Sequence, residues 1–220
     1  GRYEEAIPFW REAVLEAQAQ GLPEEEGEYR RRIGIIRSSQ GKPLEALAEF
    51  DAILALPEDS ISPLLRARTR LRRGVALEEI GRPEEAALEL NAVLDEARKM
   101  GNSSLLAQAH RALVLLHIWT GKPERVRAHA DRALDLARES GARAVEFWTF
   151  WGLAVFEGLL GNTEAMGAWV KESEKVAREL GSPLLRLRSS ELAIEQAAAT
   201  GEWDRGVALG EQAIDMARAL

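Results

Sequence analysis

The 220-residue sequence predicts an all-helical solenoid, in which antiparallel helix pairs stack one after another. Three observations lead to this fold class. A short motif recurs with a period of 40 residues, a second set of glycines divides the periods in half, and the apolar residues in between follow helical spacing. Alanine, leucine, glutamate and arginine dominate the composition, and these residues lose little conformational freedom in a helix.

The repeated motif begins with glycine, as in Gly41-Lys42-Pro43-Leu44-Glu45-Ala46, and its copies start at positions 1, 41, 81, 121, 161 and 201. Glycine adopts the left-handed conformation that ends many helices. Proline two residues later suits the first turn of the next helix, where its missing N–H is not needed. Glutamates then lie where the helix dipole favours negative charge. Each copy therefore predicts the end of one helix and the start of another.

A second set of breaks lies midway between the first, at Gly21, Gly101, Gly141 and Gly181. Position 61 lacks its glycine, and we expect the segment 57–63 to supply that break. The chain thus divides into about eleven segments, each a helix of about 15 residues followed by a short turn. The predicted repeats are 1–40, 41–80, 81–120, 121–160 and 161–200 with a half repeat at 201–220, all in a single domain over 1–220.

Composition excludes several other classes of protein and site. The absence of cysteine excludes disulfides and thiolate metal sites and fits a reducing compartment, so we expect a cytoplasmic location. No run of 18 apolar residues is present, so we expect no membrane partner. A formal charge of −7 argues against nucleic-acid binding by this segment.

Residues at fixed offsets from the motif glycines resemble the tetratricopeptide repeat superfamily over the whole chain. That family has a small residue seven positions before the glycine, which Gly34, Gly74 and Ala154 match, whereas Val114 and Ile194 depart from it. The family's other positions are matched as follows: an aromatic residue at Tyr3 and Trp203, alanine at Ala6, Ala46 and Ala86, and a bulky residue at Trp10, Phe50 and Leu90.

The 40-residue period resembles the long-repeat variety found in helical arms of bacterial signal-transduction ATPases and transcription activators, and in kinesin-light-chain-like and cell-polarity scaffolds. The resemblance implies a right-handed superhelix that binds a peptide, a protein or, in some activators, a small inducer. We therefore expect a scaffold that binds a protein or peptide on its concave face. The alternative is a ligand-sensing arm of a larger ATPase or transcription regulator.

Charge is divided unequally between the two sets of predicted helices. The helices that precede the motif glycines carry 13 basic and 10 acidic residues, whereas the other segments carry 16 and 26. The resemblance places the first set on the concave face, which favours an acidic partner. Alternatively, the acidic residues at helix starts only complement the helix dipoles.

Tryptophan and arginine supply the candidate partner-binding residues, because both are frequent in binding hot spots. In the family, offsets of 2, 10 and 13 residues before the motif glycine face the groove. The residues at those offsets are Arg31, Arg68, Arg111, Trp119, Trp148, Trp151 and Arg188. Alternatively, the tryptophans pack between helices in the core.

Nothing in the sequence indicates catalysis, a cofactor or a metal site. His110 and His117 lie seven residues apart on one helix face without a nearby carboxylate, so we expect a packed, hydrogen-bonded pair rather than metal ligands. No nucleophile–base set can be assembled, and each glycine is isolated rather than part of a phosphate loop. We therefore expect that the protein is not an enzyme.

The sequence begins without methionine, and we expect further repeats on both sides in a longer protein. Uncapped terminal helices would then give weak self-association. Two sets of apolar residues are expected at the ends, facing a missing helix or the neighbouring pair: Ile7, Trp10, Val14 and Ala17 in the first helix, and Val207, Ile214 and Ala217 in a final helix that ends at Leu220.

Overall fold

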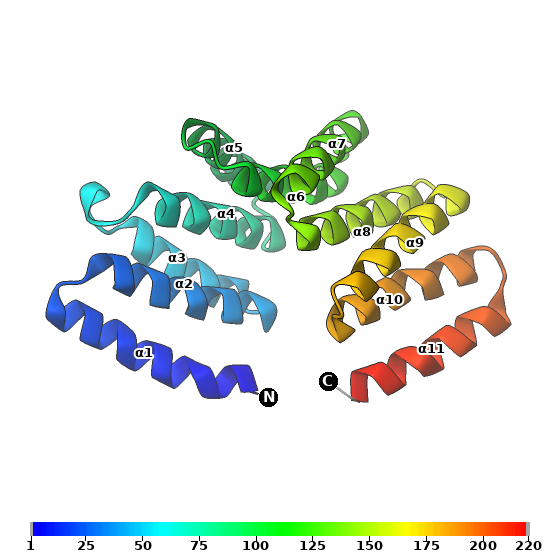
Figure 1. Cartoon of the computed structure of the whole chain (residues 1–220), viewed down its shortest axis with the longest axis horizontal. Helices are drawn as coiled ribbons and strands as arrows, with labels where there is room; N and C mark the ends of the chain where they lie inside the picture. The colour runs from blue at the N-terminus through cyan, green and yellow to red at the C-terminus, as the bar shows by residue number, and fades with distance from the viewer. Residues whose placement is uncertain (1, 219–220) are drawn as a thin grey trace. The chain divides into compact units, whose positions relative to one another are not determined.

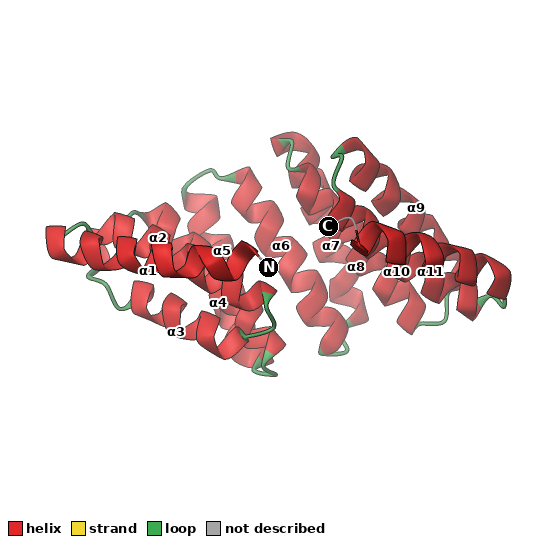
Figure 2. Ribbon diagram, turned by 90° about the horizontal axis from the view of Figure 1, so that it is seen from below, coloured by secondary structure: helices red, strands yellow, loops and turns green. Residues whose placement is uncertain are grey.

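The computed structural model describes residues 2–218, with side chains from residue 5 onward. Within this range the chain is helical and contains no strand, which confirms the predicted all-α solenoid (Figures 1 and 2). Gly1, the Tyr3 side chain and Leu220, to which the sequence assigned roles, lie outside what is described. The helices are α1 (Arg2–Gln20), α2 (Pro23–Ser39), α3 (Pro43–Leu54), α4 (Pro63–Glu79), α5 (Pro83–Lys99), α6 (Ser103–Trp119), α7 (Pro123–Ser140), α8 (Arg143–Leu159), α9 (Thr163–Glu179), α10 (Pro183–Ala199) and α11 (Trp203–Arg218). No helix among them is long and apolar enough to cross a membrane.

Left-handed glycines end the helices, as the motif predicts. Gly41 has a φ of 70°, its N–H donates to the Ser38 carbonyl at 2.9 Å, and the Lys42 N–H donates to the Arg37 carbonyl at 3.0 Å. These two bonds form the Schellman arrangement, which satisfies carbonyls that the helix itself leaves unpaired. The described glycines with positive φ are Gly21, Gly41, Gly81, Gly101, Gly121, Gly141, Gly161, Gly181 and Gly201.

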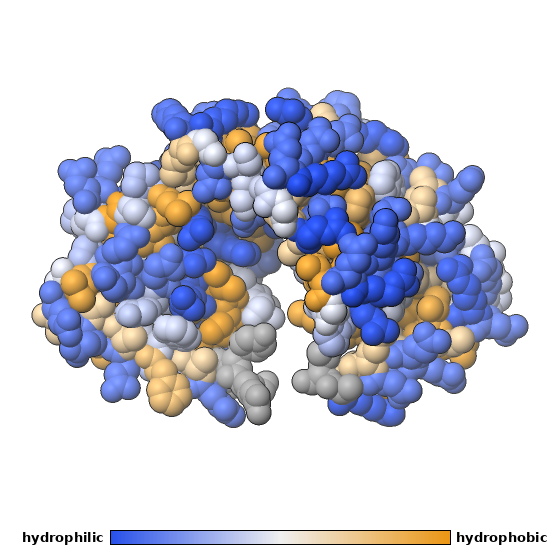
Figure 3. Space-filling view, viewed as in Figure 1, coloured by the Kyte–Doolittle hydropathy of each residue, from blue (hydrophilic) through white to orange (hydrophobic). Residues whose placement is uncertain are grey.

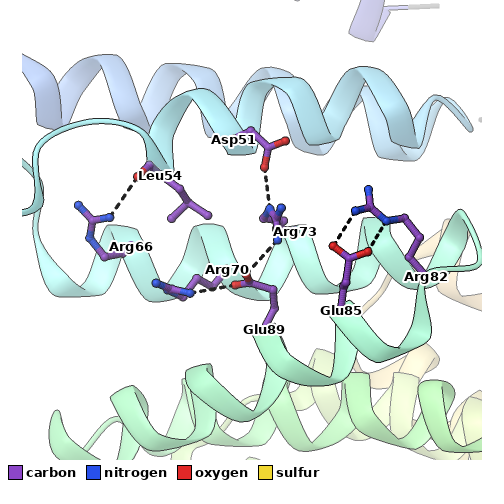
Figure 4. A network of polar contacts seen from close by, with 8 residues as sticks. All are labelled: Asp51, Leu54, Arg66, Arg70, Arg73, Arg82, Glu85 and Glu89. Atoms are coloured by element: carbon purple, nitrogen blue, oxygen red, sulfur yellow. Dashed lines mark hydrogen bonds and ion pairs between the residues drawn. The ribbon is translucent and has the colours of Figure 1, made fainter.

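The turn without glycine, between α3 and α4, is held by polar side chains. A single 3₁₀ turn, Glu58–Ser60, occupies the break. Ser62 caps α4 by accepting the Leu65 N–H at 3.1 Å, and the Glu24 carboxylate of α2 accepts the Ser62 N–H at 2.6 Å and its hydroxyl at 2.7 Å. The Arg66 guanidinium, drawn in Figure 4, donates at 3.4 Å to the carbonyls of Leu54, Leu56, Pro57 and Glu58.

The chain forms two compact units, residues 1–112 and 113–220, and the boundary falls within α6. In the first unit α2 contacts α4 across the intervening helix, and in the second α8 contacts α10. Among the described residues, the helices of the other layer make no comparably extensive contact with one another. Each unit therefore curves toward the layer that contains α2 and α4, or α8 and α10. We call α2, α4, α6, α8 and α10 the inner helices and the remainder the outer helices.

Small residues on the inner helices accept large residues from the outer ones. A Cβ added to Gly34 of α2 would lie 2.4 Å from the Phe50 ring of α3, and one added to Gly74 of α4 would lie 3.0 Å from Leu90 of α5. Phe50 and Leu90 are fully buried by these contacts. At Gly34 and Gly74 the small residue seven positions before the turn glycine is therefore a packing requirement, because a larger side chain would overlap Phe50 or Leu90.

The two ends of the array differ in how their apolar residues are covered. Ile7 and Val14 of α1 are buried against Ile33 of α2, so the neighbouring pair covers them. In α11, Val207 and Ile214 are 64% and 53% exposed. Of the two alternatives for the set on α1, a missing helix or the neighbouring pair, the structure therefore shows the neighbouring pair for Ile7 and Val14.

Two glycine-to-alanine substitutions are expected to change stability in opposite directions. Gly34→Ala forces a methyl group against Phe50 and should destabilise the array by about 1–3 kcal/mol. Gly210→Ala lies within α11 with no atom within 4 Å of the added Cβ, so it should stabilise by up to about 1 kcal/mol through helix propensity. Urea unfolding followed by circular dichroism measures both, and destabilisation by Gly210→Ala would show that this helix has a close neighbour.

Candidate partner-binding surfaces

One face of α4 carries arginines that hold the inner and outer helices together. Arg73 lies between Asp51 of α3 and Glu89 of α5, at 2.6 and 2.9 Å (Figure 4). Arg70 binds the same Glu89 at 3.2 Å and also reaches Glu96 at 3.2 Å. These side chains are half-buried and form a network, so their role is to fix α4 against its two outer neighbours.

On the corresponding face of α2, arginines likewise pair with carboxylates and join this helix to the outer helix α3. Arg30 binds Glu26 of its own helix at 2.7 Å and Glu49 of α3 at 3.0 Å, and Arg37 binds Glu45 of α3 at 3.0 Å. Arginines on this side of the inner helices thus have carboxylate partners within the protein.

Among the described residues, a second set of arginines on the inner helices of the first unit has no carboxylate partner on an outer helix. Arg31 of α2 pairs only with Glu28 of its own helix, at 2.8 Å. Within residues 2–218, Arg72 of α4 and Arg111 of α6 make no hydrogen bond or ion pair. We call Arg31, Arg72 and Arg111 the inner arginine row.

The members of this row act on one another electrostatically. Burial lowers the pKa of Arg72, and the positive charge of Arg31 lowers it further. The pKa of Arg111 is lowered to about 10, chiefly by burial and also by the positive charge of Arg72, while Glu78 opposes the shift. The row is therefore a set of like charges in a partly desolvated position, which is unfavourable unless a negative charge is nearby.

Glu78, at the end of α4, supplies part of that negative charge. Its pKa is raised to about 6, chiefly by burial and also by the negative charge of Glu79, while the positive charge of Arg111 opposes the shift. Glu78 and Arg111 form no ion pair within 4 Å, so the two charges interact without direct contact. The arginine row consequently remains only partly neutralised.

The structure brings together two of the predicted arginines and adds one that the sequence missed. Arg31 and Arg111 belong to the row, and Arg68 lies exposed one helical turn before Arg72. Arg72 was missed because the offset used for prediction selects Leu71, which is buried in the core. The spacing of four residues between Arg68 and Arg72, which puts both on one face of α4, was the available signal.

The predicted arginine of the second unit is in a different environment. Arg188 of α10 is exposed and pairs with Glu191 one turn later at 3.0 Å. An exposed pair of this kind contributes little to stability.

The tryptophans of the second unit lie between core and surface. Trp148 contacts Phe147 and Trp151 edge-on, with ring centroids 5.1 and 5.8 Å apart. Both tryptophans of α8 are half-buried against the core cluster of this unit, and the buried Trp151 Nε1 has no acceptor. Trp119, in the last turn of α6, is 59% exposed. The core cluster of this unit therefore covers much of the Trp148 and Trp151 side chains, whereas the Trp119 side chain is mostly exposed.

The exposed surface is otherwise mixed. In the view of Figure 3, hydrophilic residues cover most of the surface and apolar residues form separate patches. Among the described residues, no group of three His, Asp or Glu side chains could hold a metal ion. His117 packs instead against His129 of α7, with ring centroids 5.1 Å apart, and burial lowers the pKa of His117 to about 4.

Comparison with known proteins supports the fold but does not indicate a function. No protein-family model and no curated protein matches the chain. Among solved structures, the crystal structure of BtubC (BKLC) from P. vanneervenii is similar, with a TM-score of 0.75 and 15% sequence identity over 100% of this chain and 92% of that one. At this identity the likeness shows a shared helical repeat fold only.

Glu78→Gln should stabilise the protein at neutral pH. The folded state raises the pKa of Glu78 from 4.5 to about 6, so the folded state binds this proton more tightly than the unfolded chain does. The carboxylate is therefore unfavourable above pH 6, and the penalty disappears as pH falls to about 4.5. After allowance for solvent screening, the gain at pH 7.5 should be on the order of 1 kcal/mol.

Denaturant unfolding at several pH values measures this effect. The difference between Glu78→Gln and the unmodified protein should shrink as pH falls through 6. Glu84→Gln, on the exposed start of α5, is the matched control and should change little. Destabilisation by Glu78→Gln at pH 7.5 would contradict the assignment, because it would show that the charge is favourable in the fold.

Proposed function

We propose that this chain is a tetratricopeptide-type interaction scaffold, of the 40-residue variety, that binds a protein or peptide on its inner helices and does not catalyse a reaction. The observation that carries this proposal is the contrast between the two sets of arginines. Arginines that face the outer helices are matched with carboxylates, whereas Arg72 and Arg111 have no partner within the described chain. Partly desolvated charges that the fold does not need are typical of binding surfaces.

The arrangement of the repeats supports the same proposal. Inner helices of equal length place equivalent positions side by side, so successive repeats present one extended surface within a unit. Three features match the repeat motif of that superfamily in position. They are the small residue Gly34 against which Phe50 packs, the glycines in the turns, and the prolines at the first helical positions. Such an array offers a long, shallow surface suited to a peptide.

A selection from a peptide library with no charge bias tests the proposal directly. We expect binders whose addition protects the amides of inner helices from hydrogen exchange. Protection confined to the outer helices would contradict the proposal. If no peptide is selected while small molecules raise the melting temperature, the alternative of a ligand-sensing arm is favoured instead.

Two exposed tryptophans provide a matched pair for mapping a binder. Trp119 ends an inner helix, whereas Trp203 opens the outer helix α11, and the two are 59% and 68% exposed. For a peptide that protects the second unit, Trp119→Ala should weaken binding by about 1 kcal/mol or more, because truncation of a contacting tryptophan removes a large apolar contact. Trp203→Ala should leave the affinity unchanged, and equal effects of the two would place the binder elsewhere.

We also propose weak self-association through the exposed face of α11. Val207 and Ile214 lie on one side of this helix, and removing such apolar area from water contributes about 25 cal/mol per Å². Sedimentation at rising protein concentration should show a shift in mass that Val207→Lys with Ile214→Lys abolishes. A double variant that associates as strongly as the unmodified chain would place the contact on another surface.

A further inference from the structure

The outer helix α3 is shorter than α5 and α9, and a cavity lies beyond its end. Helix α3 contains 12 residues and ends at Leu54, whereas α5 and α9 each contain 17. It therefore stops more than one helical turn early. A cavity of about 680 Å³ lies between the segment that follows, the start of α4 and the last turn of α5. Small-molecule sites commonly have volumes of about 300–1,000 Å³, so the break in the repeat leaves a space of ligand size.

The loop that forms one wall of this cavity is fixed by the rest of the protein. Arg66 donates to four main-chain carbonyls of the loop. The Glu24 carboxylate of α2 accepts both the N–H and the hydroxyl of Ser62. A wall that is ordered before binding loses less conformational entropy when a ligand binds. The cavity is therefore suited to a small ligand.

Charged side chains of both signs line the cavity without pairing with one another. They are Glu58, Asp59, Arg66, Glu96 and Lys99. Within residues 5–218, the side chains of Glu58, Asp59 and Lys99 have no hydrogen bond or ion pair. Arg66 donates to main-chain carbonyls rather than to a carboxylate. The cavity thus holds unpaired groups of both signs on separate elements of the fold.

Glu96, in the last turn of α5, is only partly satisfied by the protein. Its Oε1 atom forms an ion pair with Arg70 Nε at 3.2 Å, but its buried Oε2 atom has no donor among the described residues. Burial raises the pKa of Glu96, and nearby cationic side chains, Arg70 foremost, oppose the shift. A buried acceptor without a donor is unfavourable. An ammonium group in the cavity would supply that donor.

We propose that this cavity, which we call the turn cavity, binds a small zwitterion with a primary ammonium and a carboxylate, the chemistry of a free amino acid. Glu96 and the two loop carboxylates accept from the ammonium, and Lys99 donates to the ligand carboxylate beside Arg66. A ligand of one charge would leave the groups of the other sign unpaired. This site goes beyond the proposed function, because it lies at the α3–α4 turn and needs no partner on the inner helices.

Two-dimensional ¹H–¹⁵N NMR of the full chain with each of the free L-amino acids in turn tests the proposal. At least one amino acid should shift the amides of residues 58–66 and 96–99, which line or adjoin the turn cavity. It should leave the amides of the second unit unchanged. No shift at the turn cavity with any amino acid at millimolar concentration would overturn the proposal, and so would shifts confined to another part of the chain.

Blocked forms of the selected amino acid show whether both of its charges are recognised. The methyl ester keeps only the ammonium, and the N-acetyl form keeps only the carboxylate. Each should bind about tenfold more weakly in calorimetry, because each loses one set of charge-assisted hydrogen bonds. Undiminished binding of the ester would show a cation site and undiminished binding of the N-acetyl form an anion site, and either would overturn the proposal. An unblocked dipeptide that binds more tightly would support the same chemistry and identify a short peptide as its source.

Substitutions in the turn cavity should each act on one charge of the ligand. Lys99→Gln should weaken binding of the free amino acid by about tenfold and leave the methyl ester unaffected. Glu96→Gln should weaken the free amino acid and leave the N-acetyl form unaffected. Arg98→Gln and Asp95→Asn are matched controls and should change neither affinity, because these neighbouring residues pair with each other at 2.8 Å outside the cavity. Equal weakening of all three ligands by Lys99→Gln would contradict the role assigned to Lys99.

This proposal and the proposed function can fail separately. A peptide on the inner helices and an amino acid in the turn cavity act on different amides. Loss of amino-acid binding in Lys99→Gln should therefore leave the affinity for a selected peptide unchanged. A peptide whose affinity fell equally in this variant would show that the turn cavity is part of the peptide site, and would overturn the assignment of a separate zwitterion site.

Discussion

The uniform length of the inner helices, with a left-handed glycine at nearly every turn, is the constraint on which the rest of this structure depends. The inner helices α2, α4 and α6 each contain 17 residues, so equivalent positions recur at the same height. This regularity lets Gly34 and Gly74 accept a large residue from the following outer helix in the same way. It also gives Arg31 and Arg111 the same position, ten residues before their turn glycines, whereas Leu71 holds that position in α4 and Arg72 follows it. Replacing a turn glycine so that a helix continued further would shift the equivalent positions, the packing at Gly34 and Gly74, and the placement of the arginines together.

The inner helices differ in how the arginines on their two faces are paired. Arg70 and Arg73 of α4 are held by carboxylates of the outer helices, and they contribute to the contact between layers. Arg72, one position away from Arg73 and on another side of the helix, has no such carboxylate. Arg72 and Arg73 are therefore adjacent residues of one type in different environments, and only contacts with the neighbouring outer helices distinguish them.

Local chemistry explains which features were predictable from the sequence. Glycine and proline act within a few residues of their own position, so the helix ends and the two-layer repeat followed directly from the motif. Which residues lie on the surface was harder to predict from the sequence. Each residue turns a helix by about 100°, so an offset that is wrong by one selects Leu71 of the core instead of Arg72. The burial of Trp148 and Trp151 depends on side chains from other helices, which no local pattern encodes. The break at 57–63 was located correctly, but its dependence on Arg66 and Glu24 arises from contacts distant in sequence.

The absence of lysine from the inner helices has a consequence for regulation. Acetylation and ubiquitination act on lysine amines, and all five of these lie outside the inner helices. The positive charge of the arginine row is therefore beyond the reach of the enzymes that most often neutralise basic surfaces. Arginine also keeps its proton across the physiological pH range even where burial lowers its pKa to about 10, as at Arg111. Only a bound anion or methylation of the guanidinium groups would change how these arginines interact, since the charge itself is permanent.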